Sequence, residues 1–263
     1  MAFPTTPKNG EQYVVDDVTW EYVASKGSWD LVSWTKPYNP PLVELFSVGG
    51  STTWFKPTNA STVFVAVIGG GGGGQAGSST EGGQGGYGGG YSSATFDAAL
   101  LPSSVSVTIG TFGLAGTTTP GGLGTSGGTS SFGTALRAGG GPRGGSFPVL
   151  TGGTGHYVGG AGGLSTANGE DSYGGGAGGG GGGFNSTPAG IGGSSVPYSI
   201  PTGWVIYDLA VPGSGGSGRT GVISGPFPAY HYGGGGGGGV GGTTMSGGAE
   251  GAQGIVLVVT YFA

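Results

Sequence analysis

The apolar positions of this chain fall into short runs that predict β-strands, and the two strongest runs stand far apart. One, residues 62–68, has the sequence Thr-Val-Phe-Val-Ala-Val-Ile and leads directly into a glycine tract. The other, residues 254–263, closes the chain. Continuous apolar runs of this length that are bounded by glycine predict buried or half-buried strands. We expect the closing strand to pair near residues 62–68.

Weaker β patterns between these two runs and before them predict further strands. They are residues 42–47, 51–56, 91–96, 105–109 and 130–138. Strands that bracket a glycine-rich middle at both ends predict a small β-sandwich or barrel in which the glycine tracts are rooted.

The first part of the chain, residues 1–36, is almost free of glycine and predicts a separate β meander. We expect strands at residues 12–15, 18–23 and 29–34, with turns at Asp16-Asp17 and Lys26-Gly27. Three short strands bury too little apolar surface to be stable alone, so this module is expected to dock or to oligomerise. The proline-rich stretch 37–41 is the expected linker, and residues 42–263 form the second domain.

Glycine accounts for 72 of the 263 residues and is concentrated in long tracts. The main tracts are residues 69–74, 85–90, 174–183 and 233–239. A glycine tract can stay disordered or form three-residue-per-turn helices that bond only to neighbouring helices. With 35% hydrophobic and 7% charged residues, the composition is unlike that of disordered chains. The expected fold is therefore mainly β, with a bundle of polyglycine II helices on a sandwich-like base and little or no α-helix.

Three segments between the tracts, residues 142–158, 194–212 and 222–232, carry the large side chains that the tracts lack. Loops on a rigid scaffold concentrate binding residues, and tyrosine and tryptophan provide contact area at low entropic cost. The candidate recognition residues are Phe147, His156, Tyr157, Tyr198, Trp204, Tyr207, Phe227, Tyr230, His231 and Tyr232. The alternative is that these aromatics form a small hydrophobic cap that holds the ends of the helices together.

Charge and motif content argue against several other functions. A net charge of −5 with seven Lys plus Arg lacks a basic face for nucleic acid. No apolar stretch is long enough for membrane insertion, and there is no cysteine. The only two histidines stand in different segments without a ligand pair at metal spacing, so neither a metal nor a cofactor is expected. The carboxylates are scattered and no phosphate-binding loop is present, so we expect a protein that is not an enzyme.

Two stretches resemble known phage modules. The pattern Asn9-Gly10, Tyr13, Trp20, Tyr22 and Trp29 resembles a short module that recurs in phage tail-fibre proteins. The second domain resembles the glycine-rich domain of phage tail-fibre and receptor-binding proteins, on the motifs at residues 53–74, 85–92, 105–110, 129–133 and 138–141. The overall plan is similar to that of the tip adhesins of T-even-like long tail fibres, although the N-terminal module departs from their fibre-attachment domain.

The resemblance implies a function in host attachment. A tip adhesin would lie outside the cell at the end of a virion's tail fibre and would recognise an outer-membrane protein or a surface glycan of the bacterium. Its N-terminal module would bind other tail-fibre or virion proteins. The alternative is a structural virion component, such as a head decoration or tail assembly protein, that uses the same fold as a rigid scaffold.

Overall fold

A computed structural model describes residues 5–15, 18–34, 40–117, 120–145, 151–173, 175–184, 189–196, 232–243 and 245–262. The chain forms two compact units, Met1–Pro40 and Pro41–Ala263. Within the described residues, the single helical element is the short 3₁₀ turn η1 (Ala98–Leu100), and none is an α-helix. The prediction of a mainly β protein with little or no α-helix is confirmed.

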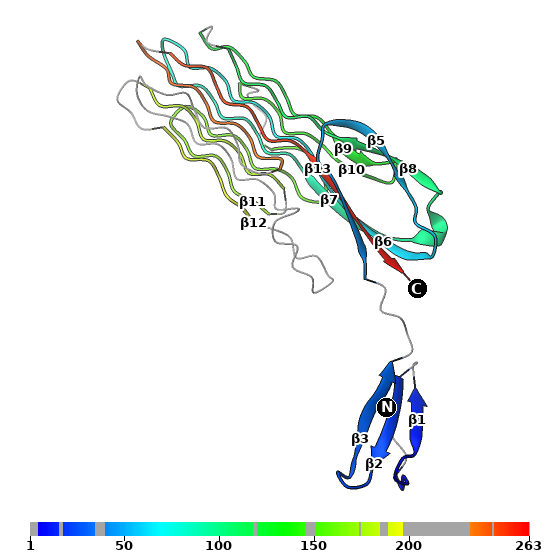
Figure 1. Cartoon of the computed structure of the whole chain (residues 1–263). Helices are drawn as coiled ribbons and strands as arrows, with labels where there is room; N and C mark the ends of the chain where they lie inside the picture. The colour runs from blue at the N-terminus through cyan, green and yellow to red at the C-terminus, as the bar shows by residue number, and fades with distance from the viewer. Residues whose placement is uncertain are drawn as a thin grey trace. The chain divides into compact units, whose positions relative to one another are not determined.

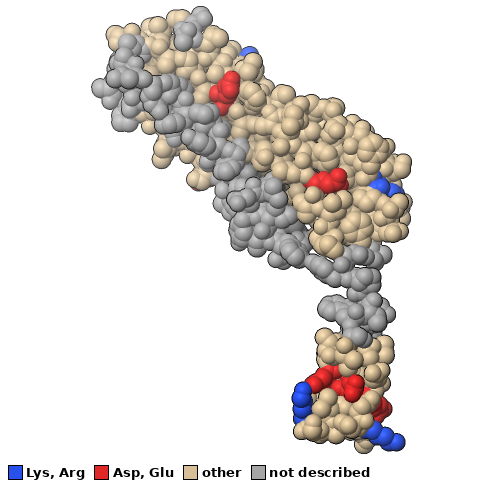
Figure 2. Space-filling model, in the orientation of Figure 1, with Lys and Arg blue, Asp and Glu red and all other residues tan. Residues whose placement is uncertain are grey.

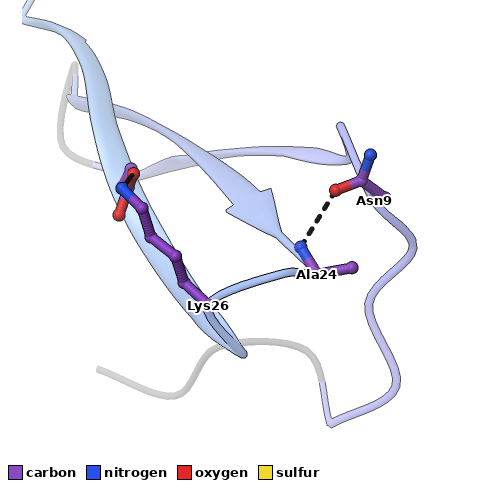
Figure 3. A network of polar contacts seen from close by, with 4 residues as sticks. Asn9, Ala24 and Lys26 are labelled. Atoms are coloured by element: carbon purple, nitrogen blue, oxygen red, sulfur yellow. Dashed lines mark hydrogen bonds and ion pairs between the residues drawn. The ribbon is translucent and has the colours of Figure 1, made fainter.

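The first unit is a three-stranded antiparallel sheet in the order β1-β2-β3. Its strands are β1 (Gln12–Val15), β2 (Val18–Val23) and β3 (Ser28–Trp34). The predicted turn at Lys26-Gly27 is present, with Gly27 in the left-handed region at φ 62°. Asn9 Oδ1 accepts a hydrogen bond of 2.9 Å from the Ala24 backbone N–H and ties the segment before β1 to the end of β2 (Figure 3).

Aromatic side chains of the three strands meet on one face of this small sheet. The rings of Tyr22 and Trp29 lie 5.5 Å apart, and those of Tyr13 and Trp29 lie 6.0 Å apart. Even so, no described side chain of this unit is buried. The sheet therefore lacks a core of its own, as its length leads one to expect.

The second unit contains two four-stranded antiparallel sheets with the orders β10-β9-β8-β5 and β4-β13-β6-β7. Their strands are β4 (Leu42–Phe46), β5 (Gly50–Phe55), β6 (Ala60–Ile68), β7 (Tyr91–Asp97), β8 (Ser104–Ile109), β9 (Ser130–Phe132), β10 (Leu136–Ala138) and β13 (Ile255–Phe262). A two-residue parallel pair, β11 (Ser172–Tyr173) and β12 (Ser195–Val196), lies apart from them.

The two strongest apolar runs of the sequence pair at the centre of one sheet. Strand β13 runs antiparallel to β6, with Ile255 opposite Ile68 and Tyr261 opposite Thr62. The predicted pairing of the closing strand is therefore confirmed. Alternate residues of β6 face opposite sides, so Val63, Val65 and Val67 enter the core between the sheets and Phe64, Ala66 and Ile68 face outward.

The core between the two sheets draws on both of them. Trp54 of β5, Val107 of β8 and Phe132 of β9 are each at most 1% exposed and pack with valines of β6 and β13. Burying large apolar side chains from both sheets is the main favourable term in folding. The base of the unit is accordingly a β-sandwich.

One strand prediction is wrong. Residues 130–138 were expected to form a single β segment, but the structure divides them into the hairpin β9–β10, with Leu136 opposite Phe132. Gly133 lies in the turn at φ 55°, a conformation that side chains other than glycine adopt with strain. The apolar pattern alone did not distinguish a tight turn from a continuous strand.

The glycine-rich segments run side by side away from the two sheets (Figure 1). We call them rods. They are residues 69–77, 82–90, 110–117, 121–129, 139–145, 159–163, 167–171, 175–183, 189–194, 233–242 and 245–254. Several continue a strand without a break: β6 leads into rod 69–77, β8 into rod 110–117 and β10 into rod 139–145. In the opposite direction, rods 82–90, 121–129 and 245–254 lead into β7, β9 and β13.

Hydrogen bonds of rod 69–77 repeat every three residues. Backbone N–H groups of Gly69, Gly72 and Gln75 donate to carbonyls of rod 82–90. The residue after each of these donates to rod 121–129, and the next residue donates to rod 245–254. These N–H···O distances are 2.8 to 3.0 Å. Carbonyls of rod 69–77 accept from rods 139–145, 110–117 and 233–242. Six neighbours thus satisfy the backbone of one rod, the repeat that three-residue-per-turn helices imply. The polyglycine II conformation itself stays a prediction.

The close approach of neighbouring backbones explains why the rods consist of glycine. A Cβ atom built on Gly71 would overlap the carbonyl oxygen of Gly234, and one on Gly74 would overlap that of Gly237. Both obstacles are backbone atoms that cannot rotate away. The rods therefore depend on the absence of a side chain at positions such as Gly71 and Gly74, where a neighbouring backbone is in direct contact.

The bundle has two ends that differ in structure. At the sheet end, the rods join strands of the sandwich. At the free end, short connections reverse the chain, for instance residues 78–81 between rods 69–77 and 82–90 and residues 164–166 after rod 159–163. Strand β4 begins at Leu42, which lies opposite Thr260 near the end of β13. It ends at Phe46, which lies opposite Val256, the second residue of β13 after rod 245–254. The chain therefore enters this unit at the end of the sandwich that is remote from the rods.

Candidate functional site

The described part of the chain contains three of the ten candidate recognition residues, and all three lie at the sheet end of the rods. These are His156, Tyr157 and Tyr232. The other seven, Phe147, Tyr198, Trp204, Tyr207, Phe227, Tyr230 and His231, lie outside the described residues.

Tyr157 is held against the first residue of β7. Its backbone N–H and carbonyl exchange hydrogen bonds of 3.0 and 2.9 Å with Tyr91, and the two rings lie 6.0 Å apart. Tyr91 is 3% exposed and belongs to the cluster on the outer face of sheet β4-β13-β6-β7. Tyr157, half-buried, extends this cluster, so at least part of its side chain stabilises the sheet.

Tyr232 packs against the same outer cluster from another segment. It is half-buried, and it precedes Gly233, whose N–H donates to the Gln253 carbonyl at 2.9 Å. Gly233 adopts φ 78° and begins rod 233–242. Tyr232 therefore stands at the root of a rod, beside the sheet.

His156 is exposed, yet the neighbouring strand fixes its position. Its backbone N–H donates to Ser92 Oγ at 3.1 Å, and its Nδ1 accepts from the Ser93 backbone N–H at 3.2 Å. Because Nδ1 acts as an acceptor, Nε2 is the ring nitrogen that can meet another molecule. Of the three described candidates, His156 is the one whose side chain is open to contact.

Both ends of the segment that holds most candidates lie at the sheet end of the bundle. Val196, which precedes it, pairs with Tyr173 in the β11–β12 pair, and Tyr232 follows it. The sequence alone had placed the candidates only at unspecified rod ends. The described residues on either side of this segment, Val196 and Tyr232, therefore lie beside the sandwich.

A second place of interest lies at the free end, and sequence analysis missed it. A pocket of about 380 Å³ is lined by Gln75, Glu81, Gly82, Gln84, Gly145, Leu164 and Ser165. Glutamines at inward positions of glycine tracts were the available signal, since a three-residue repeat places Gln84 and Tyr87 on the same side of rod 82–90.

Buried polar groups lie behind this pocket. Gln84 Nε2 donates to the Tyr87 hydroxyl at 2.8 Å, and Gln84 Oε1 accepts from the Gly145 N–H at 2.8 Å. Gln84 is 5% and Tyr87 2% exposed. Burial raises the pKa of the Tyr87 phenol, the hydrogen bond from Gln84 opposes this change, and the Glu170 carboxylate adds to it. The phenol therefore stays neutral and keeps the Gln84 amide in one orientation.

Charged side chains are sparse on the second unit, and Figure 2 shows only a few of them on the face that it presents. Among the described residues, no three His, Cys, Asp or Glu side chains gather as a metal site would require. No helix within the same residues is long and apolar enough to span a membrane.

Comparison with known families assigns the second unit. The family model described as a glycine-rich domain matches residues 46–261, which is more than half of the chain. The chain belongs to this glycine-rich domain family. A search of curated proteins found no match. The glycine-rich domain extends from the last residue of β4 almost to the end of β13, so it includes the rods and both sheets apart from most of β4, whereas the first unit lies outside it.

Proposed function

We propose that this glycine-rich domain protein is the receptor-binding protein at the tip of a phage tail fibre. Its receptor is an outer-membrane protein or a surface glycan of the host bacterium. The observation that carries the proposal is the bundle itself, in which each rod is held by backbone hydrogen bonds to its neighbours while segments rich in large side chains interrupt the glycine. Such a frame loses little side-chain entropy on folding and holds its connections in fixed positions.

The polarity of the second unit supports the same proposal. Within this unit, the chain begins at the end of the sandwich that is remote from the rods. An adhesin attached through this end would present the exposed candidate His156 at the opposite end of the sandwich, where the rods begin. The first unit, with its aromatic face and no buried described side chain, is proposed to bind other tail-fibre or virion proteins.

The test is competition for phage adsorption with the purified full chain. A variant in which residues 197–212 are replaced by a short Gly-Ser linker leaves the β11–β12 pair intact, because β12 ends at Val196. We expect the full chain to bind host cells and the variant to lose binding while its unfolding transition is unchanged. A matched control removes exposed apolar side chains from a rod, Phe112→Ala with Leu114→Ala, which are 37% and 53% exposed.

Either outcome separates the two functions under consideration. The adhesin proposal is supported if the linker variant no longer binds host cells and the rod control binds them normally. The adhesin proposal is wrong if the full chain does not bind cells of the bacterium that is infected by the phage carrying this protein. In that case a structural virion component, for which the rods supply rigidity alone, becomes the better explanation.

A further inference from the structure

The pocket at the free end of the rods has the size and the chemistry of a small-ligand site. Its volume of about 380 Å³ lies within the range of about 300–1,000 Å³ that is usual for ligand pockets. Rods 69–77, 82–90 and 139–145 and the connection after rod 159–163 all contribute to it.

The floor of the pocket presents amide groups whose positions are fixed. Gln84 is held by the Tyr87 hydroxyl and by Gly145, and Gln75 Oε1 accepts from the Gln84 backbone N–H at 3.2 Å. Gln75 Nε2 also donates to the Gly121 carbonyl at 3.3 Å. An amide has two N–H groups and two lone pairs on oxygen, so each glutamine can still make a further hydrogen bond. A ligand thus meets donors and acceptors that need no rearrangement.

The rim of the pocket adds one charge, one hydroxyl and one apolar side chain. Glu81 is exposed, and among the described residues of the lining it is the one that is ionisable. Leu164 is 50% exposed, and Ser165 follows it. This combination favours a ligand with several hydroxyl groups and an apolar C–H face, and it disfavours an anion near the Glu81 carboxylate.

We propose that this pocket binds one sugar residue of a bacterial surface glycan, either neutral or carrying an amino group. The hydroxyls of a pyranose both donate and accept, which matches the Gln75 and Gln84 amides and the Glu81 carboxylate. Its C–H face matches the side chain of Leu164. The Glu81 carboxylate disfavours acidic sugars. The inference rests on the proposed function, since it names a glycan as ligand of the adhesin.

The test is saturation-transfer NMR on the purified full chain with methyl glycosides of glucose, glucosamine and glucuronic acid as probes. We expect transfer to the first two glycosides and none to the glucuronide. Leu164→Ala should weaken binding of both sugars several-fold, and Glu81→Gln should reduce the preference for glucosamine over the glucuronide. Matched controls are Ile191→Ala, at a side chain that is 63% exposed, and Glu250→Gln, at another exposed carboxylate.

These outcomes are independent of cell binding. Weaker transfer in Leu164→Ala and a reduced preference for glucosamine in Glu81→Gln, with both controls unchanged, support the sugar site. No transfer to any probe, or equal transfer in all variants, overturns it. If the full chain still competes for adsorption in that case, only the sugar site is wrong. If the sugars bind and no cell does, the proposed function is wrong and the pocket stands.

Discussion

The indole Nε1 of Trp54 donates a hydrogen bond of 2.8 Å to Glu44 Oε2, and this bond joins the edge strands of the two sheets. Trp54 belongs to β5 and Glu44 to β4. The Trp54 side chain is 1% exposed, and its ring lies 5.4 Å from that of Phe132. A carboxylate on one sheet thus satisfies the polar atom of a core aromatic on the other.

Removal of this acceptor should destabilise the sandwich. In Glu44→Ala the buried indole N–H loses its partner, which costs about 1–3 kcal/mol in the free energy of unfolding. Glu44→Gln keeps an oxygen acceptor and should cost less. Urea unfolding of these variants, alone and combined with Trp54→Phe, measures the coupling. An equal loss for Glu44→Ala in the Trp54→Phe background would contradict the role of the bond.

A single methyl group inside a rod should be more damaging. In Gly71→Ala the new Cβ would overlap the Gly234 carbonyl oxygen, so two rods must separate and lose hydrogen bonds. We expect a loss of more than about 3 kcal/mol, at the upper end of overpacking effects. The control is Gly49→Ala, whose Cβ would meet side-chain atoms of Gln253 and Thr111 that can move. Similar urea midpoints for the two variants would show that the rods tolerate side chains.

Stability at alkaline pH should depend on Tyr87. Burial raises the pKa of its phenol above the ordinary value of 10.0, so the unfolded chain releases this proton first. The contribution is fully present below the unfolded pKa and is lost as the pH rises through the folded pKa. Tyr87→Phe should lower stability at neutral pH by about 1 kcal/mol, because Gln84 loses its acceptor. The free energy of unfolding of Tyr87→Phe should also fall less at alkaline pH, because this variant has no phenol to titrate at this position. Urea midpoints across this pH range check both effects, and parallel declines would refute the assignment.

Tyr157 and His156 should respond differently to mutation although they are neighbours. Tyr157→Ser removes a ring that packs on Tyr91 and the outer cluster, so we expect a loss of about 2 kcal/mol, less than for a fully buried aromatic. His156→Ala removes an exposed side chain and should change stability by less than about 1 kcal/mol. Thermal unfolding of both variants tests this, and the reverse order would mean that the ring of Tyr157 is dispensable.

The sheets could be predicted from sequence because their signal is local. The length and continuity of the apolar runs at residues 62–68 and 254–263, which are bounded by glycine, were sufficient to predict the β6–β13 pair. The hairpin β9–β10 was missed because three-residue strands are too short to show a period. The two-residue pair β11–β12 was also missed, since its residues carry no β pattern and are paired only by the rods beside them.

The arrangement of the candidate site was less accessible. The order of the rods in the bundle depends on hydrogen bonds between backbone groups. Every glycine has the same N–H and carbonyl, so the sequence does not indicate which rods are neighbours. The pocket at Gln75 and Gln84 forms between rods that are distant in the chain, and composition does not indicate it. Tyr157 was predicted as a recognition residue from its type and its place in a segment between glycine tracts, and its contact with Tyr91 required the fold.

The three-residue repeat of rod 69–77 also restricts how this protein can change its length. Deleting one residue from the middle would turn every later N–H toward a different neighbour, and deleting three would restore the directions but shorten the rod by one turn. Insertions and deletions within rods are therefore expected in multiples of three and in several rods together. Insertions or deletions of a single residue are expected in the connections, where the frame keeps its dimensions.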